Sequence, residues 1–136
     1  EELRERAGKI PFEIMVLDSP AGIGCPVIAA LKGNDQAVLV TEPTPSAFAD
    51  LKRVLTIVNY FKIPFGVVIN KWSLNPAKSK EIKKWVLRQI QGRFLGQIGY
   101  DQRIFQAISQ LKPVINTKLP VKKEIKAIYA RLRKTL

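Results

Sequence analysis

An aspartate followed by a glycine-containing turn ends the first apolar segment of the chain. The run EIMVLD at 13–18 ends in Asp18 and continues into SPAGIGCP, where Gly22 and Gly24 allow a tight turn. The helix expected next directs its free N–H groups back toward this turn, which suits it to bind an anion. A carboxylate is also a ligand that Mg²⁺ accepts, directly or through its bound water. Asp18 is therefore a candidate metal and catalytic residue, and a structural aspartate that caps the turn is the alternative.

The composition excludes several kinds of site. The 136 residues include one cysteine, Cys25, and no histidine. An internal disulfide, a Cys/His zinc site and a histidine-based triad are therefore excluded. Cys25 stands at the start of an expected helix, where a thiolate could be reactive, but without a second cysteine or a histidine we expect a buried structural thiol. No apolar run reaches the length of a membrane span and the first ten residues hold no apolar signal core, so a cytoplasmic location is the default expectation.

The formal net charge of +12 indicates attraction to phosphates, anionic lipids or an acidic partner. The lysines are spread along the whole chain, as on the solvated surface of many α/β proteins. No strip of aromatic residues and glycines that would stack bases accompanies the charge. Binding to nucleic acid is thus an open alternative that the sequence does not favour.

Four short runs rich in Val, Ile and Leu predict β-strands, at residues 13–18, 36–42, 65–71 and 94–100. Their nearly continuous apolar character is typical of strands that helices cover on both faces. Helical patterns alternate with these strands, at residues 26–33, 45–62, 78–90, 102–111 and 121–135, and SLNPAKSK at 73–80 is expected to be a mobile loop. The alternation predicts an α/β fold: one domain, 1–136, with a three-layer parallel sheet and helices on both faces.

Ligands of an open parallel sheet bind beyond the carboxyl ends of its strands. Glu42 ends the second predicted strand and either orients a water or a partner, or caps the helix that follows. Lys71 ends the third strand and either shields a phosphate, lies along a base, or is simply solvated. The final helical pattern is apolar on one side and basic on the rest. We expect it to pack on the sheet, and a membrane-surface helix is the alternative.

Three stretches make a resemblance specific: VLDSPAGIGCPVIAAL, VLVTEPTPSAFADLKRVL and GVVINK, in this order and spacing. Over residues 14 to about 110 the chain resembles the MinD/ParA superfamily of P-loop ATPases, and most of all the MinD-type ATPases with an inserted ferredoxin domain. The resemblance implies a P-loop NTPase-like fold with ATP and Mg²⁺ as cofactors. It also implies that Asp18 acts on Mg²⁺ and the attacking water and that the Gly22 backbone lies near the γ-phosphate.

The resemblance assigns a base-recognition role to the end of the third predicted strand and to the loop after the fourth. The Asn70 side chain would hydrogen-bond adenine, since an amide offers both a donor and an acceptor. Lys71 would lie beside it, and Tyr100 and Asp101, in GYDQRI, would cover the other side of the base. Nucleotide-dependent dimerisation, reset by hydrolysis, is the activity that this family would imply.

The chain departs from the family because it contains no GxxxxGK[ST] loop, whose lysine and hydroxyl grip the phosphates and Mg²⁺. We therefore expect the C-terminal portion of such a domain, incomplete at its N-terminal side, with ATP and Mg²⁺ binding weak or absent and hydrolysis not expected for this chain alone. One cysteine also excludes a Cys₄ iron–sulfur cluster. A non-catalytic module that binds a partner or nucleic acid is the alternative function.

The missing phosphate-binding segment also predicts a gap in the sheet. In the family that segment begins with a strand lying between the first strand predicted here and the strand ending at Glu42. Unpaired edges in the middle of a sheet are costly, so we expect a preceding segment or a partner to fill the gap. The expected partners are ATP or ADP together with either a second copy or a complementing N-terminal segment.

Overall fold

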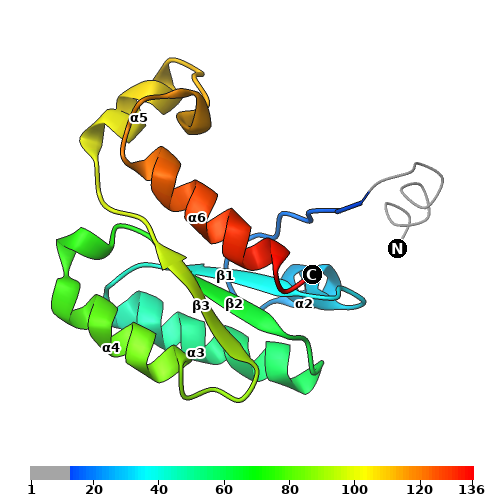
Figure 1. The fold of residues 1–136 in the computed structure, drawn as a ribbon. Coiled ribbons are helices and arrows are strands. Elements are labelled where there is room, and N and C mark those ends of the chain that lie inside the picture. The colour runs from blue at the N-terminus through cyan, green and yellow to red at the C-terminus, as the bar shows by residue number, and fades with distance from the viewer. Residues whose placement is uncertain (1–12) are drawn as a thin grey trace.

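The computed structural model describes residues 13–136, which form a three-stranded parallel sheet with helices on both faces (Figure 1). The strands are β1 (Ala37–Thr41), β2 (Phe65–Ile69) and β3 (Gly92–Gln97), and β2 lies in the middle. Three of the four predicted strands are therefore present. The strand predicted to begin at Phe94 corresponds to β3. It begins at Gly92 instead, because Gly92 and Arg93 also pair with β2.

Five helices of the described residues alternate with these strands or follow them, as expected for this class of fold. They are α2 (Cys25–Leu31), α3 (Pro45–Tyr60), α4 (Pro76–Val86), α5 (Gln102–Ser109) and α6 (Val121–Arg133), with short 3₁₀ segments η1 (Trp72–Leu74) and η2 (Val114–Asn116). None of them is long and apolar enough to cross a membrane.

The prediction of a mobile loop at 73–80 is wrong, because two ordered elements occupy it. Residues Trp72 to Leu74 form η1, and α4 begins at Pro76, directly after Asn75. The Asn75 side chain accepts a hydrogen bond from the Lys78 N–H at 3.0 Å and so caps the helix. Asparagine followed by proline is a helix-start signal that the loop prediction did not use.

One face of the sheet carries the main core, where α3 and α4 pack below the strands (Figure 1). The predicted stripe of α3 is buried as expected, through Phe48, Leu51, Leu55 and Val58. All five residues of β2 are buried as well. Because β2 has a strand on each side and helices over both faces, its near-continuous apolar sequence is explained.

On the opposite face α6 packs against β3, as expected for this helix. Its Ile128 side chain lies over Gly96, and the Arg131 guanidinium donates to the carbonyl oxygen of Leu95 at 2.7 Å. This contact coincides with a β-bulge, since Val67 pairs with Phe94 and the next residue of β2 pairs with Gly96. The bulge and the absent Cβ of Gly96 let the helix approach closely.

The strand predicted at 13–18 is not formed, although the sequence there is apolar. Ile14, Met15 and Val16 are all exposed, Val16 to 85%. A strand is stable only with a hydrogen-bonded neighbour, and among residues 13–136 the edge strand β1 pairs with β2 alone. Within the part of the chain that the structure describes, the apolar run has no strand beside it and stays unpaired.

Gly96 generates a testable prediction about the contact between α6 and β3. Its φ of +155° is unfavourable for other residues, and an added Cβ would lie 2.6 Å from Cγ1 of Ile128. We expect Gly96→Ala to lower the free energy of unfolding by about 1–3 kcal/mol, through strain and displacement of α6. Urea unfolding followed by circular dichroism measures this change.

The matched control is Gly99→Ala, because a Cβ at this position would lie no closer than 3.6 Å to its nearest neighbour, Oε1 of Glu124. It should leave the stability close to that of the unmodified chain. Equal stabilities of the two variants would contradict the packing described for Gly96.

Candidate functional site

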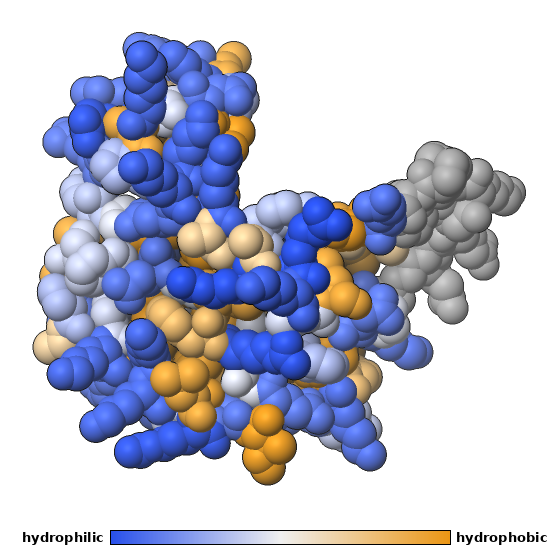
Figure 2. Space-filling view, viewed as in Figure 1, coloured by the Kyte–Doolittle hydropathy of each residue, from blue (hydrophilic) through white to orange (hydrophobic). Residues whose placement is uncertain are grey.

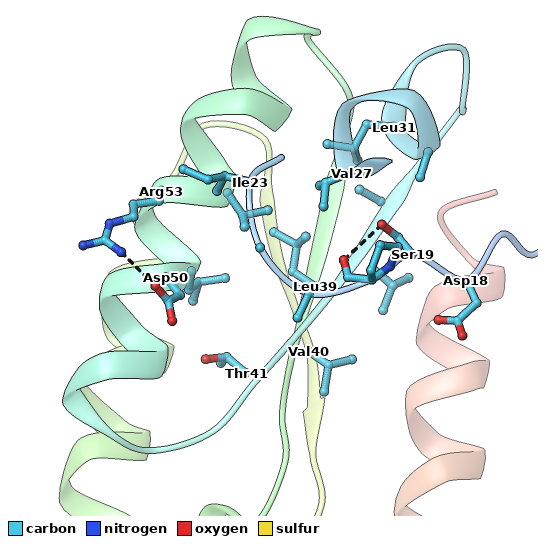
Figure 3. A pocket seen from close by; sticks show the side chains of 18 of the residues that line it. Asp18, Ser19, Ile23, Val27, Leu31, Leu39, Val40, Thr41, Asp50 and Arg53 are labelled. Carbon is cyan, nitrogen blue, oxygen red and sulfur yellow. Dashed lines mark hydrogen bonds and ion pairs between the residues drawn. The ribbon is translucent and has the colours of Figure 1, made fainter. Parts of the chain in front are cut away.

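A groove of about 880 Å³ lies along β1 and is lined by the turn that follows Leu17, by β1 itself and by α3. Three of the predicted site residues, Asp18, Gly22 and Asn70, line this one groove although up to 52 positions separate them in sequence. Asp18 lies on the side toward α6, whereas Asp50 and Arg53 on α3 form an ion pair of 3.1 Å on the other side (Figure 3).

The turn from Asp18 to Gly24 has the backbone shape that its glycines predicted. Gly22 has φ of +114°, a left-handed conformation in which a side chain would be strained, and nothing lies within 4 Å of the position that its Cβ would take. Gly24 is the N-cap of α2, and its carbonyl accepts from the N–H of Val27 at 3.0 Å. The turn therefore offers open backbone to a ligand in the groove.

Asp18 is an exposed carboxylate at the groove wall. A metal ion is normally held by several protein ligands, but residues 13–136 contain no group of three or more His, Cys, Asp or Glu side chains placed to bind one. A hard oxygen donor such as Asp18 fits Mg²⁺ that keeps most of its waters and takes its other ligands from elsewhere. By itself, Asp18 is suited only to a bond through water or to one direct contact.

Asn70 follows β2 and is held by its neighbours on both sides. Its N–H donates to the carbonyl oxygen of Thr41 at 2.7 Å, which continues the β1–β2 ladder by one residue. Its side-chain Oδ1 accepts the N–H of Lys71 at 3.0 Å. No hydrogen bond within the described residues engages Nδ2, so the amide retains a donor for a ligand.

Lys71 and Glu42 link the carboxyl ends of the two neighbouring strands. The Lys71 Nζ lies 2.8 Å from Oε1 of Glu42. The hydrogen bond and charge of Glu42 raise the pKa of Lys71 above its ordinary value of 10.5. Of the two alternatives for Glu42, capping of the next helix is wrong, because the N-cap of α3 is Thr44, whose hydroxyl accepts the Ala47 N–H at 3.1 Å.

Tyr100 and Asp101 lie in the loop after β3 and do not line the groove. Tyr100 is half exposed, and its N–H donates to Oγ of Ser73 at 2.9 Å. Asp101 is the N-cap of α5 and forms an ion pair of 2.7 Å with Arg103, whose hydrogen bonds lower the pKa of the Asp101 carboxyl. The Asp101 carboxylate is thus engaged in capping, a role that the sequence analysis did not assign.

Two side chains that the sequence analysis missed hold the same loop. Oε2 of Glu124, on α6, accepts the N–H of Gly99 at 3.1 Å, and Ser73 accepts the next N–H as described above. These pairs are 25 and 27 residues apart, so no local pattern could have revealed them. Cys25, which we expected to be buried, is exposed, because α2 buries Val27 and Leu31 instead.

The chain shares sequence with proteins of which it spans a quarter to about half. No protein-family model matches it. An uncharacterised protein of Methanocaldococcus jannaschii is 35% identical over 75 residues, which are 55% of this chain and 27% of that protein. The septum site-determining protein MinD of Neisseria meningitidis is 30% identical over 142 aligned residues, covering 96% of this chain and 52% of the relative.

Two solved structures share the fold. The MinD cell division protein of Aquifex aeolicus matches 97% of this chain and 58% of its own, with a TM-score of 0.80 and 21% identity. A protein assigned to plasmid partition in Borrelia burgdorferi, solved with AMPPNP bound, matches 79% of this chain and 42% of its own, with a TM-score of 0.59 and 16% identity. The sequence likeness to MinD and the shared fold show that the chain is related, at low identity, to the MinD/ParA superfamily of P-loop ATPases.

Proposed function

We propose that the chain is the nucleotide-sensing part of a MinD/ParA-like ATPase, containing the switch turn and the adenine-recognition segment but not the phosphate-binding loop. In this proposal residues 1–136 are the C-terminal portion of one nucleotide-binding domain. The complete domain would act as a switch in which ATP promotes dimerisation and hydrolysis resets it. The relatives whose names describe septum-site selection, cell division and plasmid partition support the class of protein, not a choice of process.

The observation that carries the proposal is that Asp18, Gly22 and Asn70 line one groove. Asn70 directly follows β2, where ligands of parallel sheets bind, and Asp18, which precedes α2, lines the same groove. The open backbone at Gly22 and the retained donor of Asn70 are the two kinds of group that a phosphate and a base require.

Each residue has a distinct role in this proposal. Asn70 would donate from Nδ2 to an adenine ring nitrogen, and Tyr100 and Asp101 would border the other side of the base. Asp18 would orient water on a Mg²⁺ ion, and the Gly22 backbone would lie near the terminal phosphate. ATP with Mg²⁺ would supply the energy of the switch in the complete domain, where a phosphate-binding loop would provide the lysine that SPAGIGCP lacks.

The proposed partners are ATP or ADP together with either a second copy or a complementing N-terminal segment. The alternative of a non-catalytic module that binds a partner or nucleic acid rests on the net charge alone. Net positive charge alone does not indicate nucleic-acid binding, which also requires side chains that stack on bases or contact their edges, so we do not favour that alternative.

Adenosine tests the base-recognition role without interference from the basic surface, because it is uncharged. We expect adenosine at millimolar concentration to raise the melting temperature of the chain and to shift the NMR signal of the Asn70 side-chain amide. Asn70→Ala should remove the rise in melting temperature, since it deletes the donor. Asn59→Ala, at the exposed end of α3, is the control and should keep it.

A second prediction concerns the ion pair beside Asn70. Because Glu42 raises the pKa of Lys71, the stability from this pair is complete below pH 10.5 and is lost as pH rises through the folded-state pKa. Glu42→Gln should therefore lower the pKa of Lys71, which a ¹³C NMR titration of its Cε measures. Glu81→Gln breaks a different pair, with Lys78 at 2.6 Å, and should leave Lys71 unchanged. If Glu42→Gln leaves the pKa of Lys71 unchanged, the ion pair between Glu42 and Lys71 is contradicted.

A further inference from the structure

The helix α5 ends in a residue that is unusual for its position. The N–H of Lys112 donates to the carbonyl oxygen of Ala107, and the N–H of Leu111 donates to that of Ile108, both at 2.9 Å. These two bonds form a Schellman motif, in which the residue at the position of Leu111 has a left-handed backbone and is usually glycine. Leu111 has φ of 54°, which is unfavourable for a residue with a Cβ. The chain therefore keeps a leucine where glycine would be less strained.

Packing within the described chain does not account for this leucine. Its side chain is 92% exposed, so it buries almost no apolar surface. Phe105 and Ile108 are 74% and 58% exposed, and residues three apart are neighbours on a helix surface. Leu111 follows them at the end of the same helix. We call these three side chains the α5 apolar surface, and clustered exposed apolar side chains of this kind are typical of interaction sites.

The surroundings of the α5 apolar surface are strongly basic. Residues 100–136 contain nine Lys or Arg and only two Asp or Glu, and both acidic side chains already have the partners described above. Lys112 is next to Leu111, and Lys118 and Lys123 lie on either side of the start of α6. All three lysines are exposed, and no ion pair within residues 13–136 engages them. A partner on this surface would therefore meet uncompensated positive charge.

The lysines and the α5 apolar surface belong to one part of the fold. The 3₁₀ segment η2 contacts both α5 and α6, so the chain that carries the lysines packs beside α5. In Figure 1, α5 lies on an arm that stands clear of the sheet. No residue of α5 lines the groove beside β1. This region is therefore separate from the proposed nucleotide site.

Charge complementarity and the strained leucine indicate an acidic protein segment as the occupant. Binding to a bilayer depends on the apolar area that is buried, and gives no reason to hold one leucine in a fixed, strained conformation. A protein partner packs against side chains in defined positions, so it does give such a reason. A nucleic-acid backbone would pair with the lysines but would leave the apolar side chains uncovered. A second copy of this chain would bring like charges together.

We propose that α5 is a docking site for an acidic, amphipathic segment of another protein. Apolar side chains of that segment cover the α5 apolar surface, and its carboxylates pair with the three lysines beside it. The apolar contacts supply most of the affinity, and the charges select and orient the partner. The docking site goes beyond the proposed function and requires no nucleotide.

The probe is a synthetic amphipathic peptide of about 18 residues, with leucine on one helical face and glutamate on the other. A peptide of the same composition in scrambled order, without two separate faces, is the control. By fluorescence anisotropy, the full chain should bind the first peptide at least about tenfold more tightly, because only this peptide covers the apolar surface and pairs with the lysines together. Added NaCl should weaken the binding, since the paired charges are close to solvent.

Leu111→Gly separates docking from stability. Glycine suits the left-handed backbone, so the melting temperature should stay the same or rise, whereas loss of the leucine should weaken peptide binding at least about fivefold. Phe105→Ser should weaken binding in the same way. Ile90→Ser is the matched control, because Ile90 is a fully exposed apolar residue between α4 and β3. It should bind the peptide like the unmodified chain.

A double variant, Lys112→Gln with Lys123→Gln, tests the basic part of the site. Its control is Lys80→Gln with Lys84→Gln on α4, which also removes two exposed positive charges. Only the first double variant should weaken peptide binding and reduce its dependence on NaCl.

Four results would each overturn the docking site. They are equal binding of the two peptides, binding by Leu111→Gly or Phe105→Ser that equals binding by Ile90→Ser, and equal effects of the two double lysine variants. The fourth is binding of the chain to phosphatidylglycerol vesicles that Phe105→Ser abolishes, which would assign the α5 apolar surface to a membrane instead.

Discussion

Parallel pairing of β2 with β1 and β3 is the constraint on which the other elements depend. All five residues of β2 are buried, with α3 and α4 packed over one face of the sheet and α6 over β3 on the other. This arrangement of one sheet between two layers of helices aligns the carboxyl ends of the strands. Thr41, Asn70 and the loop at Gly99 therefore lie at the same edge of the sheet. Hydrogen bonds from Asn70 to Thr41 and from Ile98 to Ile69 extend the ladders by one residue and fix where the following loops begin.

The same constraint explains why the molecule is well packed on one side of β2 and open on the other. The bulge at Leu95 and Gly96 lets α6 pack closely on β3, whereas the valines of β1 are exposed to solvent. Figure 2 shows hydrophilic side chains over most of one face, with apolar ones gathered in separate groups, and the arm that carries α5 standing clear of the body. Asp18, Gly22 and Asn70 line the groove on this open side, so part of the proposed nucleotide site and the open sheet edge lie in the same region.

Periodicity and apolar runs predicted the elements whose partners lie within the chain. The stripe of α3 and the strand at Phe65 are examples, since burial of one helix face and of a whole central strand leaves a direct pattern. The strand predicted at 13–18 is not formed, because a strand needs a hydrogen-bonded neighbour as well as a suitable sequence. The rule on carboxyl ends located Asn70, whereas Asp18 lines the same groove without the strand that its prediction assumed. The supports at Ser73 and Glu124 depend on contacts between distant residues.

Amide hydrogen exchange of this chain alone, resolved by NMR, tests the open edge of β1 most directly. The structure predicts slow exchange at Leu39 and Thr41, which point toward β2, and fast exchange at Val38 and Val40, whose amides face the groove. Uniformly slow exchange along β1 would mean that another strand already covers this edge, and would contradict the open edge of β1.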